Sequence, residues 1–297
     1  MAFPPPPPAP SPPASLGRRF RAYVLLPHAV PVLTVLGATA GFALLAAGGL
    51  PPPAALARLL LAMLGGQVLV GAVNELVDAD LDAATKPWKP IPSGAVTRRG
   101  AWVVVALGLV VMAAFGSRLD HLALLLLILG TALGLAYDLG LKRTPYSWLP
   151  YVLALPLLPI WVRIAILGFD GRLLLLFPLG AGAVAAVHLA QSLPDCESDR
   201  RAGLRNPVSR LGEPAALRLA CILATSAPLF AIVVTTALPG ALGNRVLVFV
   251  AAMVGLGLIG ATMALYRRRR SLGLRAAFPC LATATVVVAL GWIIGAS

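Results

Sequence analysis

The sequence predicts an all-α polytopic membrane protein with nine transmembrane helices around a central cavity. Hydrophobic residues make up 59% of the 297 positions and charged residues only 12%, about half the charged fraction of a soluble domain. Mean hydropathy is +0.89. Nine apolar stretches are long enough to cross a hydrocarbon core of about 30 Å. They are residues 22–49, 54–77, 98–116, 120–138, 146–167, 172–194, 214–237, 243–266 and 272–296.

The N-terminal region differs in composition from everything that follows. Five consecutive prolines, Pro4 to Pro8, exclude a helix there, so residues 1–21 are interpreted as a Pro-rich disordered cytoplasmic tail. Arg18, Arg19 and Arg21 then precede an apolar run, as in a signal peptide. That run is too long for a signal-peptide core, which indicates an uncleaved first span and a membrane domain covering residues 22–297.

The positive charges predict the orientation. In a nine-span topology, 19 of the 24 Lys and Arg residues lie on the side of the N-terminus. The remaining five are Arg58, Arg118, Arg163, Arg172 and Arg245. The N-terminus and the loops after spans 2, 4, 6 and 8 are therefore expected in the cytoplasm of a multi-pass cell-membrane protein. The net charge of +13 is loop charge rather than a nucleic-acid surface, because no basic helix with interleaved aromatics occurs.

The most informative stretch runs from Asn74 to Gly94, where the second span is expected to leave the bilayer. On a helix, Asn74, Asp78 and Asp82 fall at i, i+4 and i+8, within one stripe of about 80°, whereas Asp80 faces elsewhere. Lys86 and Lys89 follow at once. A row of oxygen ligands next to lysines indicates a site for a divalent cation and a phosphorylated substrate.

A second polar stripe closes the sixth span. His188, Gln191, Asp195 and Asp199 fall on one face of a helix, with Arg200 and Arg205 beyond them. A third patch ends the fourth span and contains Tyr137, Lys142 and Arg143. All three patches are expected at the same membrane face.

Together the patches suit a reaction at a diphosphate. Two carboxylate clusters can hold Mg²⁺ ions whose coordination shells are completed by substrate phosphate oxygens. Metal and basic side chains stabilise the charge on a departing diphosphate. An allylic cation left behind needs an apolar chamber without water, which a helical bundle provides.

The arrangement resembles the UbiA superfamily of intramembrane prenyltransferases. Its first signature is similar to Asn74-x-x-x-Asp78-x-x-x-Asp82 followed by a basic, Pro-rich segment ending in Gly94, and its second to Asp195-x-x-x-Asp199 followed by Gly203. The resemblance implies a nine-helix bundle and transfer of a prenyl group from a prenyl diphosphate to an aromatic or lipid-like acceptor. It also implies Mg²⁺ binding, with Asn74, Asp78 and Asp82 on one ion and Asp195 and Asp199 on another. Asp195 and Tyr137 are the expected catalytic residues. The expected substrate-binding residues are Asn74, Lys86, Lys89, Lys142, Arg143, His188, Gln191, Arg200 and Arg205.

Two other functions stay open. A terpene cyclase on the same bundle would capture the cation within the substrate instead of on an acceptor. An ion-coupled transporter would use Asn74, Asp78, Asp195 and Asp199 as cation ligands, although transporter sites tend to lie near the bilayer midplane. Some of these residues also have an interpretation that involves no active site. The acids could form surface charge pairs, and His28 could simply lie at the membrane interface. The run Arg267 to Arg270 is interpreted as a topology anchor or a contact with anionic membrane lipid.

Overall fold

The structure is a computed structural model that describes residues 16–201, 203–237 and 244–296. These residues form helices without any strand, and nine of the helical segments within them are long and apolar enough to cross a membrane. The predicted fold class and span number are thereby confirmed. The membrane-crossing segments are α2 (Ala29–Ala47), α3 (Pro53–Thr85), α4 (Arg98–Gly116), α5 (His121–Leu139), α6 (Leu149–Leu167), α7 (Leu176–Ser192), the successive helices α10 (Glu213–Ala224) and α11 (Ser226–Ala237), α12 (Arg245–Arg268) and α13 (Arg270–Ala296). Shorter elements are α1 (Leu16–Leu25), η1 (Leu141–Arg143), η2 (Gly171–Leu175), η3 (Leu193–Asp195), α8 (Cys196–Arg201) and α9 (Pro207–Leu211).

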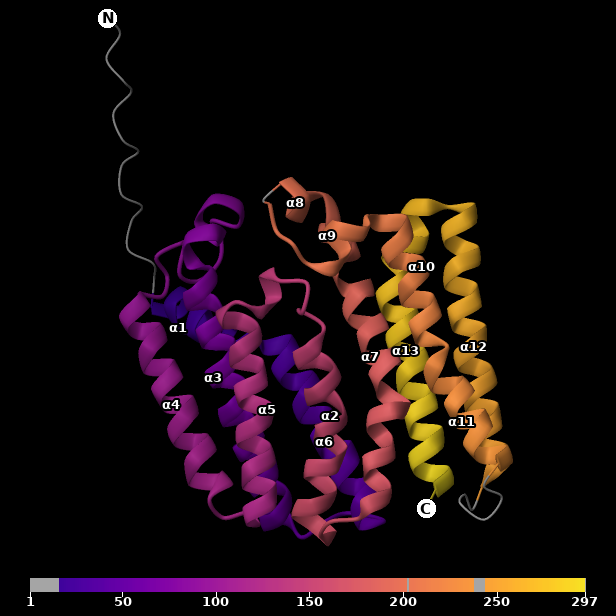
Figure 1. The fold of residues 1–297 in the computed structure, drawn as a ribbon. Coiled ribbons are helices and arrows are strands. Elements are labelled where there is room, and N and C mark those ends of the chain that lie inside the picture. Colours follow the sequence, from indigo (N-terminus) through magenta and orange to yellow (C-terminus); the bar gives the residue numbers. More distant parts are fainter. Residues whose placement is uncertain (1–15, 202, 238–243, 297) are drawn as a thin grey trace, which may run out of the picture.

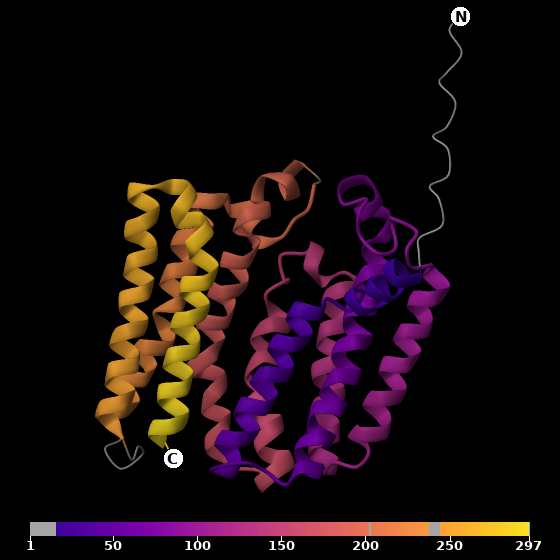
Figure 2. The same cartoon turned by 180° about the vertical axis from the view of Figure 1, so that it is seen from behind.

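The helices form two groups that meet at α7 (Figures 1 and 2). Helices α2 to α6 pack on one side, with close contacts between α3 and α4, α5 and α6, and α2 and α6. Helices α10 to α13 pack on the other side, with α12 against α13. Because α7 contacts α6 as well as α10, α11 and α13, it joins the two groups.

The N-terminal part differs from the expected single span over residues 22–49. Two helices are present instead, α1 and α2, and the chain turns between them at Leu26, Pro27 and His28. His28 has the left-handed φ of 60°, which no residue inside a continuous helix adopts. Residues 16–21, assigned to the disordered tail, are helical as well. The remainder of that tail, residues 1–15, lies outside the described part of the chain.

Helix α3 is much longer than the expected span. Its 33 residues make a helix of about 50 Å, against a core of about 30 Å, so its last turns extend beyond the membrane. Asn74 and Asp78 therefore lie within a continuous helix and not at its end, and only Asp82 lies in the last turn, where the helix dipole disfavours a carboxylate. The long helix holds these side chains on a rigid rod.

Close backbone contact fixes α4 against α3. A Cβ on Gly65 of α3 would lie 2.3 Å from the Met112 backbone nitrogen and 2.7 Å from the Gly108 oxygen, both in α4. Small residues at such crossings are typical of helix packing in membranes. The contact keeps α4 on the outer side of α3.

The two ends of the bundle carry different connections. Helix α1, the connections after α3 and α5, the short helices α8 and α9, and the turn between α12 and α13 lie at the upper end in Figure 1, and the C-terminus lies at the lower end. These are the connections that the charge count assigned to one side. Arg163 falls within the expected fifth span, residues 146–167. It lies one turn before the end of α6, where it donates to the Gly168 carbonyl at 3.1 Å.

Candidate active site

A cavity of about 930 Å³ opens between α2, α3, α5, α6 and α7. Its deeper wall is mostly apolar and includes Met63, Leu127, Leu158 and Trp161. Its polar end lies where α3, α5 and α7 approach the end of the bundle that holds α8 and α9. None of the described lining residues comes from α4 or from α10 to α13, so the cavity lies within the first group of helices and α7. The sequence suggested a cavity central to all nine spans. The cavity is instead off-centre, because α10 to α13 pack on the far side of α7.

Lys142 joins two of the predicted metal ligands. Its Nζ donates to Asn74 Oδ1 at 2.7 Å and to Asp78 Oδ2 at 2.6 Å. Arg143 Nη2 reaches the other Asp78 oxygen at 3.3 Å. The buried Asp138 lies 3.7 Å from the same ammonium. The 3₁₀ turn η1, directly after α5, thus places two positive charges on the α3 acids.

Lys89 makes a second ion cluster on α3. Its Nζ lies 2.7 Å from both Glu75 Oε1 and Asp82 Oδ2, and both carboxylates are buried. Burial lowers the pKa of the Lys89 ammonium, but hydrogen bonds to Asp82 and Glu75 outweigh burial and hold the pKa above its usual value. Lys89 therefore stays charged at neutral pH. As predicted, Asp80 faces away from this stripe, where it pairs with Arg98.

His28 contacts the same face of α3 from the hinge between α1 and α2. The Asn74 oxygen accepts from Lys142, so its amide nitrogen is the group that faces His28 Nε2, at 3.0 Å. Glu75 Oε1 lies 3.2 Å from His28 Nε2 as well. The other Glu75 oxygen is buried without a hydrogen-bond partner in the described structure. The residue that appeared interfacial in the sequence thus orients a predicted metal ligand.

The second acidic cluster lies across the cavity from α3. It does not lie on one continuous helix as predicted, because α7 ends at Ser192 and a 3₁₀ turn containing Pro194 leads into α8. Asp195 is exposed and lines the cavity, and Asp199 accepts from Asn206 Nδ2 at 2.6 Å. Asn206 is buried and also caps α9 by accepting from the Ser209 amide. The break in the helix brings both carboxylates to the polar end of the cavity.

An aromatic cluster lies just below the acids. The rings of Tyr137 and Tyr151 pack edge to face with centroids 5.2 Å apart, and the Tyr151 ring lies 4.6 Å from His188. His188 is buried, and its Nε2 lies 3.0 Å from Ser147 Oγ. All four side chains line the cavity, so they lie between the charged end and the apolar chamber.

Comparison with known families identifies the fold and the family. The sequence pattern of the UbiA prenyltransferase family matches residues 33–293, which is most of the chain. The chain belongs to the UbiA prenyltransferase family.

Two similar relatives in the UbiA family are named for different products. Digeranylgeranylglyceryl phosphate synthase of Natronomonas pharaonis is 30% identical over 175 residues, covering 59% of this chain and 63% of the relative. The bacteriochlorophyll synthase 33 kDa chain of Cereibacter sphaeroides is 29% identical over 184 residues, covering 57% of this chain and 60% of the relative. The chain thus spans less than two thirds of the length of either relative.

Solved UbiA structures share the fold over nearly the whole chain. A structure of digeranylgeranylglyceryl phosphate synthase has a TM-score of 0.75 at 16% identity and covers 94% of this chain and 98% of its own. A UbiA homologue from Archaeoglobus fulgidus, bound to DMAPP and Mg²⁺, has a TM-score of 0.67 at 18% identity, covering 91% and 99%. At these identities the likeness establishes the fold.

Most of the site residues expected from the sequence line one cavity. These are Asn74, Asp78, Asp82, Lys86, Lys89, Tyr137, Lys142, Arg143, His188, Gln191, Asp195 and Asp199. Arg200 and Arg205 do not, since both are exposed and neither is among the described lining residues. They follow the acids in sequence, but the chain turns away at α8.

Five contributors were missed by reasoning from the sequence. They are His28, Glu75, Ser147, Tyr151 and Asn206. Glu75 is adjacent to Asn74, but it lies about 100° away from the predicted stripe, so periodicity left it out. The other four lie far from the signatures in sequence or in turns, and their contacts are tertiary.

The oxygen ligands at this UbiA site suit a hard divalent cation. Among the described residues, no three His, Cys, Asp or Glu side chains lie close enough together to form a metal site by themselves. Mg²⁺ is commonly held by one or two carboxylates plus substrate phosphates, so such a set fits it. The Lys142 ammonium lies between Asn74 Oδ1 and Asp78 Oδ2, which shows that these two oxygens converge on one positive charge.

Proposed function

We propose that this protein transfers a prenyl group from a prenyl diphosphate to a hydrophobic acceptor within the membrane, in an Mg²⁺-dependent reaction. One observation carries the proposal: two acidic clusters and four basic side chains gather at the polar end of a single cavity whose deeper wall is apolar. A diphosphate fits the polar end, and an isoprenoid chain fits the apolar chamber. Family membership and the DMAPP and Mg²⁺ bound to an Archaeoglobus fulgidus homologue support the same assignment.

The acidic and the basic residues of the site have different proposed roles. Asn74 and Asp78 on α3, and Asp195 and Asp199 across the cavity, would hold Mg²⁺, which neutralises negative charge on the diphosphate as it leaves. Lys142 and Arg143 now pair with Asp78, and they are in place to turn toward diphosphate oxygens when these arrive. Lys86 and Lys89 line the cavity beside them.

The reaction breaks the bond between the prenyl C1 and the diphosphate oxygen and forms a bond from C1 to the acceptor. The acceptor loses a proton, and diphosphate is the leaving group. Tyr137 and Tyr151 lie between the charged end and the apolar chamber, where their ring faces can stabilise positive charge on the prenyl carbon. The apolar wall excludes water, which would otherwise capture that carbon.

The acceptor is proposed to be an aromatic or lipid-like molecule. The two relatives compared above are named for a glyceryl phosphate product and for bacteriochlorophyll, and both product classes have large apolar parts. A membrane cavity of about 930 Å³ has room for the apolar parts of donor and acceptor together.

The site is proposed to face the cytoplasm of a cell membrane. Of the 24 Lys and Arg residues, 19 belong to the N-terminal region and to connections at the end of the bundle that carries the acids. The positive-inside rule assigns that end to the cytoplasm.

Release of diphosphate tests the proposed reaction. Purified protein in lipid nanodiscs is supplied with prenyl diphosphates of increasing chain length, Mg²⁺ and a panel of acceptors, and products are identified by mass spectrometry. We expect diphosphate release that stops when EDTA removes Mg²⁺, together with a prenylated acceptor. A cyclic product formed without acceptor would indicate a cyclase. Substrate-driven ion flux without diphosphate release would overturn the assignment in favour of transport.

A further inference from the structure

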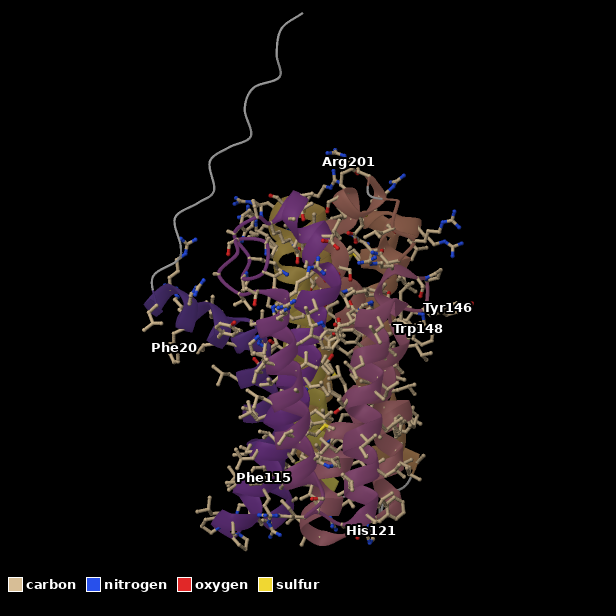
Figure 3. The ribbon with its side chains drawn as sticks, turned by 90° about the vertical axis from the view of Figure 1, so that its left-hand side faces the viewer. Phe20, Phe115, His121, Tyr146, Trp148 and Arg201 are labelled. Atoms are coloured by element: carbon tan, nitrogen blue, oxygen red, sulfur yellow. The ribbon has the colours of Figure 1, made fainter. Side chains whose placement is uncertain are left out.

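Helix α1 lies across the bundle at the end that carries the acids. It runs roughly perpendicular to the membrane-crossing helices in both side views (Figures 1 and 3). In Figure 3, Phe20 of α1 lies at a similar height to Tyr146 and Trp148 on the opposite edge. Exposed Tyr and Trp side chains gather at the membrane boundary, so this height marks the boundary of the leaflet on that side.

The exposed face of α1 is apolar along one stripe. Leu16, Phe20 and Val24 fall at i, i+4 and i+8, and their side chains are 87%, 72% and 52% exposed. Phe20 points from α1 toward the end of the bundle where Phe115 and His121 lie, which is the direction of the membrane interior (Figure 3). The stripe is therefore directed into lipid rather than into protein.

The other faces of α1 carry positive charge and the contact with the bundle. Arg21 is exposed and lies at about 100° from Phe20 around the helix. Arg19 is also exposed and lies at about 100° from Phe20 on the other side of the helix. Ala22 and Leu26 are buried against the bundle. A short helix with an apolar stripe toward lipid and arginines at the headgroup level is typical of an interfacial membrane helix.

The end of α1 is tied to the acidic helix. A Cβ on Gly71 of α3 would lie 2.5 Å from the Pro27 carbonyl oxygen, so the hinge backbone packs directly on α3 one turn before Asn74. The next residue, His28, contacts Asn74 and Glu75. The position of α1 therefore affects the hinge that orients a predicted metal ligand.

We propose that α1 docks into the headgroup and upper acyl region of the cytoplasmic leaflet and prefers anionic phospholipids. Leu16, Phe20 and Val24 enter the acyl boundary, and the exposed Arg19 and Arg21 lie among the phosphates. Bound lipid then fixes the α1 to α2 hinge. This docking requires no turnover, so it can be tested independently of the proposed reaction.

Cysteine accessibility tests the docking with a matched pair. Val24→Cys and Arg21→Cys lie on the same helix, and both positions are exposed in the protein alone. Each variant is reconstituted in vesicles of phosphatidylcholine with phosphatidylglycerol and labelled with a membrane-impermeant maleimide. We expect the cysteine of Val24→Cys to react at least about tenfold more slowly than that of Arg21→Cys, the effect of burying one aliphatic side chain. Equal rates in vesicles would overturn the proposal.

The lipid preference is tested in the Val24→Cys background. Adding Arg19→Gln, or replacing phosphatidylglycerol by phosphatidylcholine, is expected to raise the labelling rate, by about fivefold for each arginine lost near the surface. An unchanged rate in both arms would contradict a role for anionic lipid. Protection that grows with protein density in the vesicles and ignores lipid charge would indicate a second copy of the chain on this face, and would overturn lipid as the occupant.

Two controls separate docking from misfolding. The wild-type chain gives the background from Cys196, Cys221 and Cys280, of which the first two are buried and the third half-buried. Each variant must also keep the thermal stability of the wild-type chain in detergent. If Val24→Cys fails this check, the same question is answered by a fluorophore attached to Leu16→Cys, on the same stripe, whose quenching by brominated acyl chains is measured. Absence of quenching would overturn the proposal.

Discussion

Asp78 and Asp80 lie two positions apart on α3 and face different surroundings. Asp78 lines the cavity and pairs with Lys142, whereas Asp80 is exposed and pairs with Arg98. They make a matched pair for testing the site.

The Asp78→Ala variant is expected to lose about a hundredfold or more in turnover, because it removes a carboxylate that would hold the Mg²⁺ ion neutralising the departing diphosphate. Asp80→Ala is expected to keep nearly full activity, as surface substitutions usually do. Diphosphate release at saturating substrate measures both. Retained activity in Asp78→Ala, with the protein still folded, would remove the α3 acids from the site.

His28 is a positioning residue for Asn74. Its Nε2 faces the Asn74 amide at 3.0 Å, while the Asn74 oxygen points to Lys142. His28→Ala is expected to raise the half-saturating Mg²⁺ concentration by about tenfold or more, the usual cost of losing a partner of a metal ligand. The Mg²⁺ dependence of turnover measures the change.

The conservative variant separates positioning from folding. His28→Gln keeps a hydrogen-bonding group within reach of Asn74 and is expected to recover much of the Mg²⁺ affinity. His28→Asn suits the left-handed backbone at φ 60° but has a shorter side chain, so it should fold well and recover less. Equal Mg²⁺ dependence in all three variants and the wild type would argue against a positioning role.

At the scale of elements, the crossing of α3 and α4 depends on Gly65. A methyl group there would meet backbone atoms of Met112 and Gly108 at 2.3 and 2.7 Å, and backbone cannot rotate aside as a side chain can. Gly65→Ala is therefore expected to destabilise the fold by about 1–3 kcal/mol, the range for overpacking. The thermal midpoint in detergent measures it.

Gly37 of α2 is the matched control for that prediction. A Cβ on Gly37 would meet nothing within 4 Å, and alanine is the better helix former. Gly37→Ala should leave the midpoint unchanged or raise it. If Gly65→Ala behaves in the same way, α3 and α4 do not pack as closely as described.

The elements also show where periodicity succeeds and fails as a guide. It placed Asn74, Asp78 and Asp82 on one stripe correctly, because α3 is a regular helix through all three. It failed beyond Ser192, where a 3₁₀ turn at Pro194 replaces the helix that the His188 to Asp199 spacing assumed. It also missed the break at His28, since the apolar run that begins at Ala22 in α1 continues into α2.

For the whole molecule, the orientation makes a prediction. Alkaline phosphatase fused at the C-terminus should be active in a bacterial host, because the C-terminus lies at the end opposite the acids (Figure 1). The same reporter inserted at Arg269, between α12 and α13, should be inactive in the cytoplasm. Activity at Arg269 and none at the C-terminus would reverse the proposed sidedness.

The sequence by itself determined the fold class, the span number and most of the charged residues that line the cavity. Hydropathy over about 20 residues reports membrane crossing, because the bilayer acts on each helix separately. Carboxylates on one stripe report a site, because their spacing is a property of a single helix. Both signals are local and can be read from the chain alone.

The tertiary structure decided which charges meet. Lys142 bridges Asn74 and Asp78, His28 reaches Asn74 from the hinge, and Asn206 holds Asp199. It also placed the cavity among α2, α3, α5, α6 and α7, and turned Arg200 and Arg205 away from it. These facts depend on how separate helices cross and how turns are shaped. Helix crossings are set by close packing between distant residues, such as Gly65 against Met112, which no local pattern encodes.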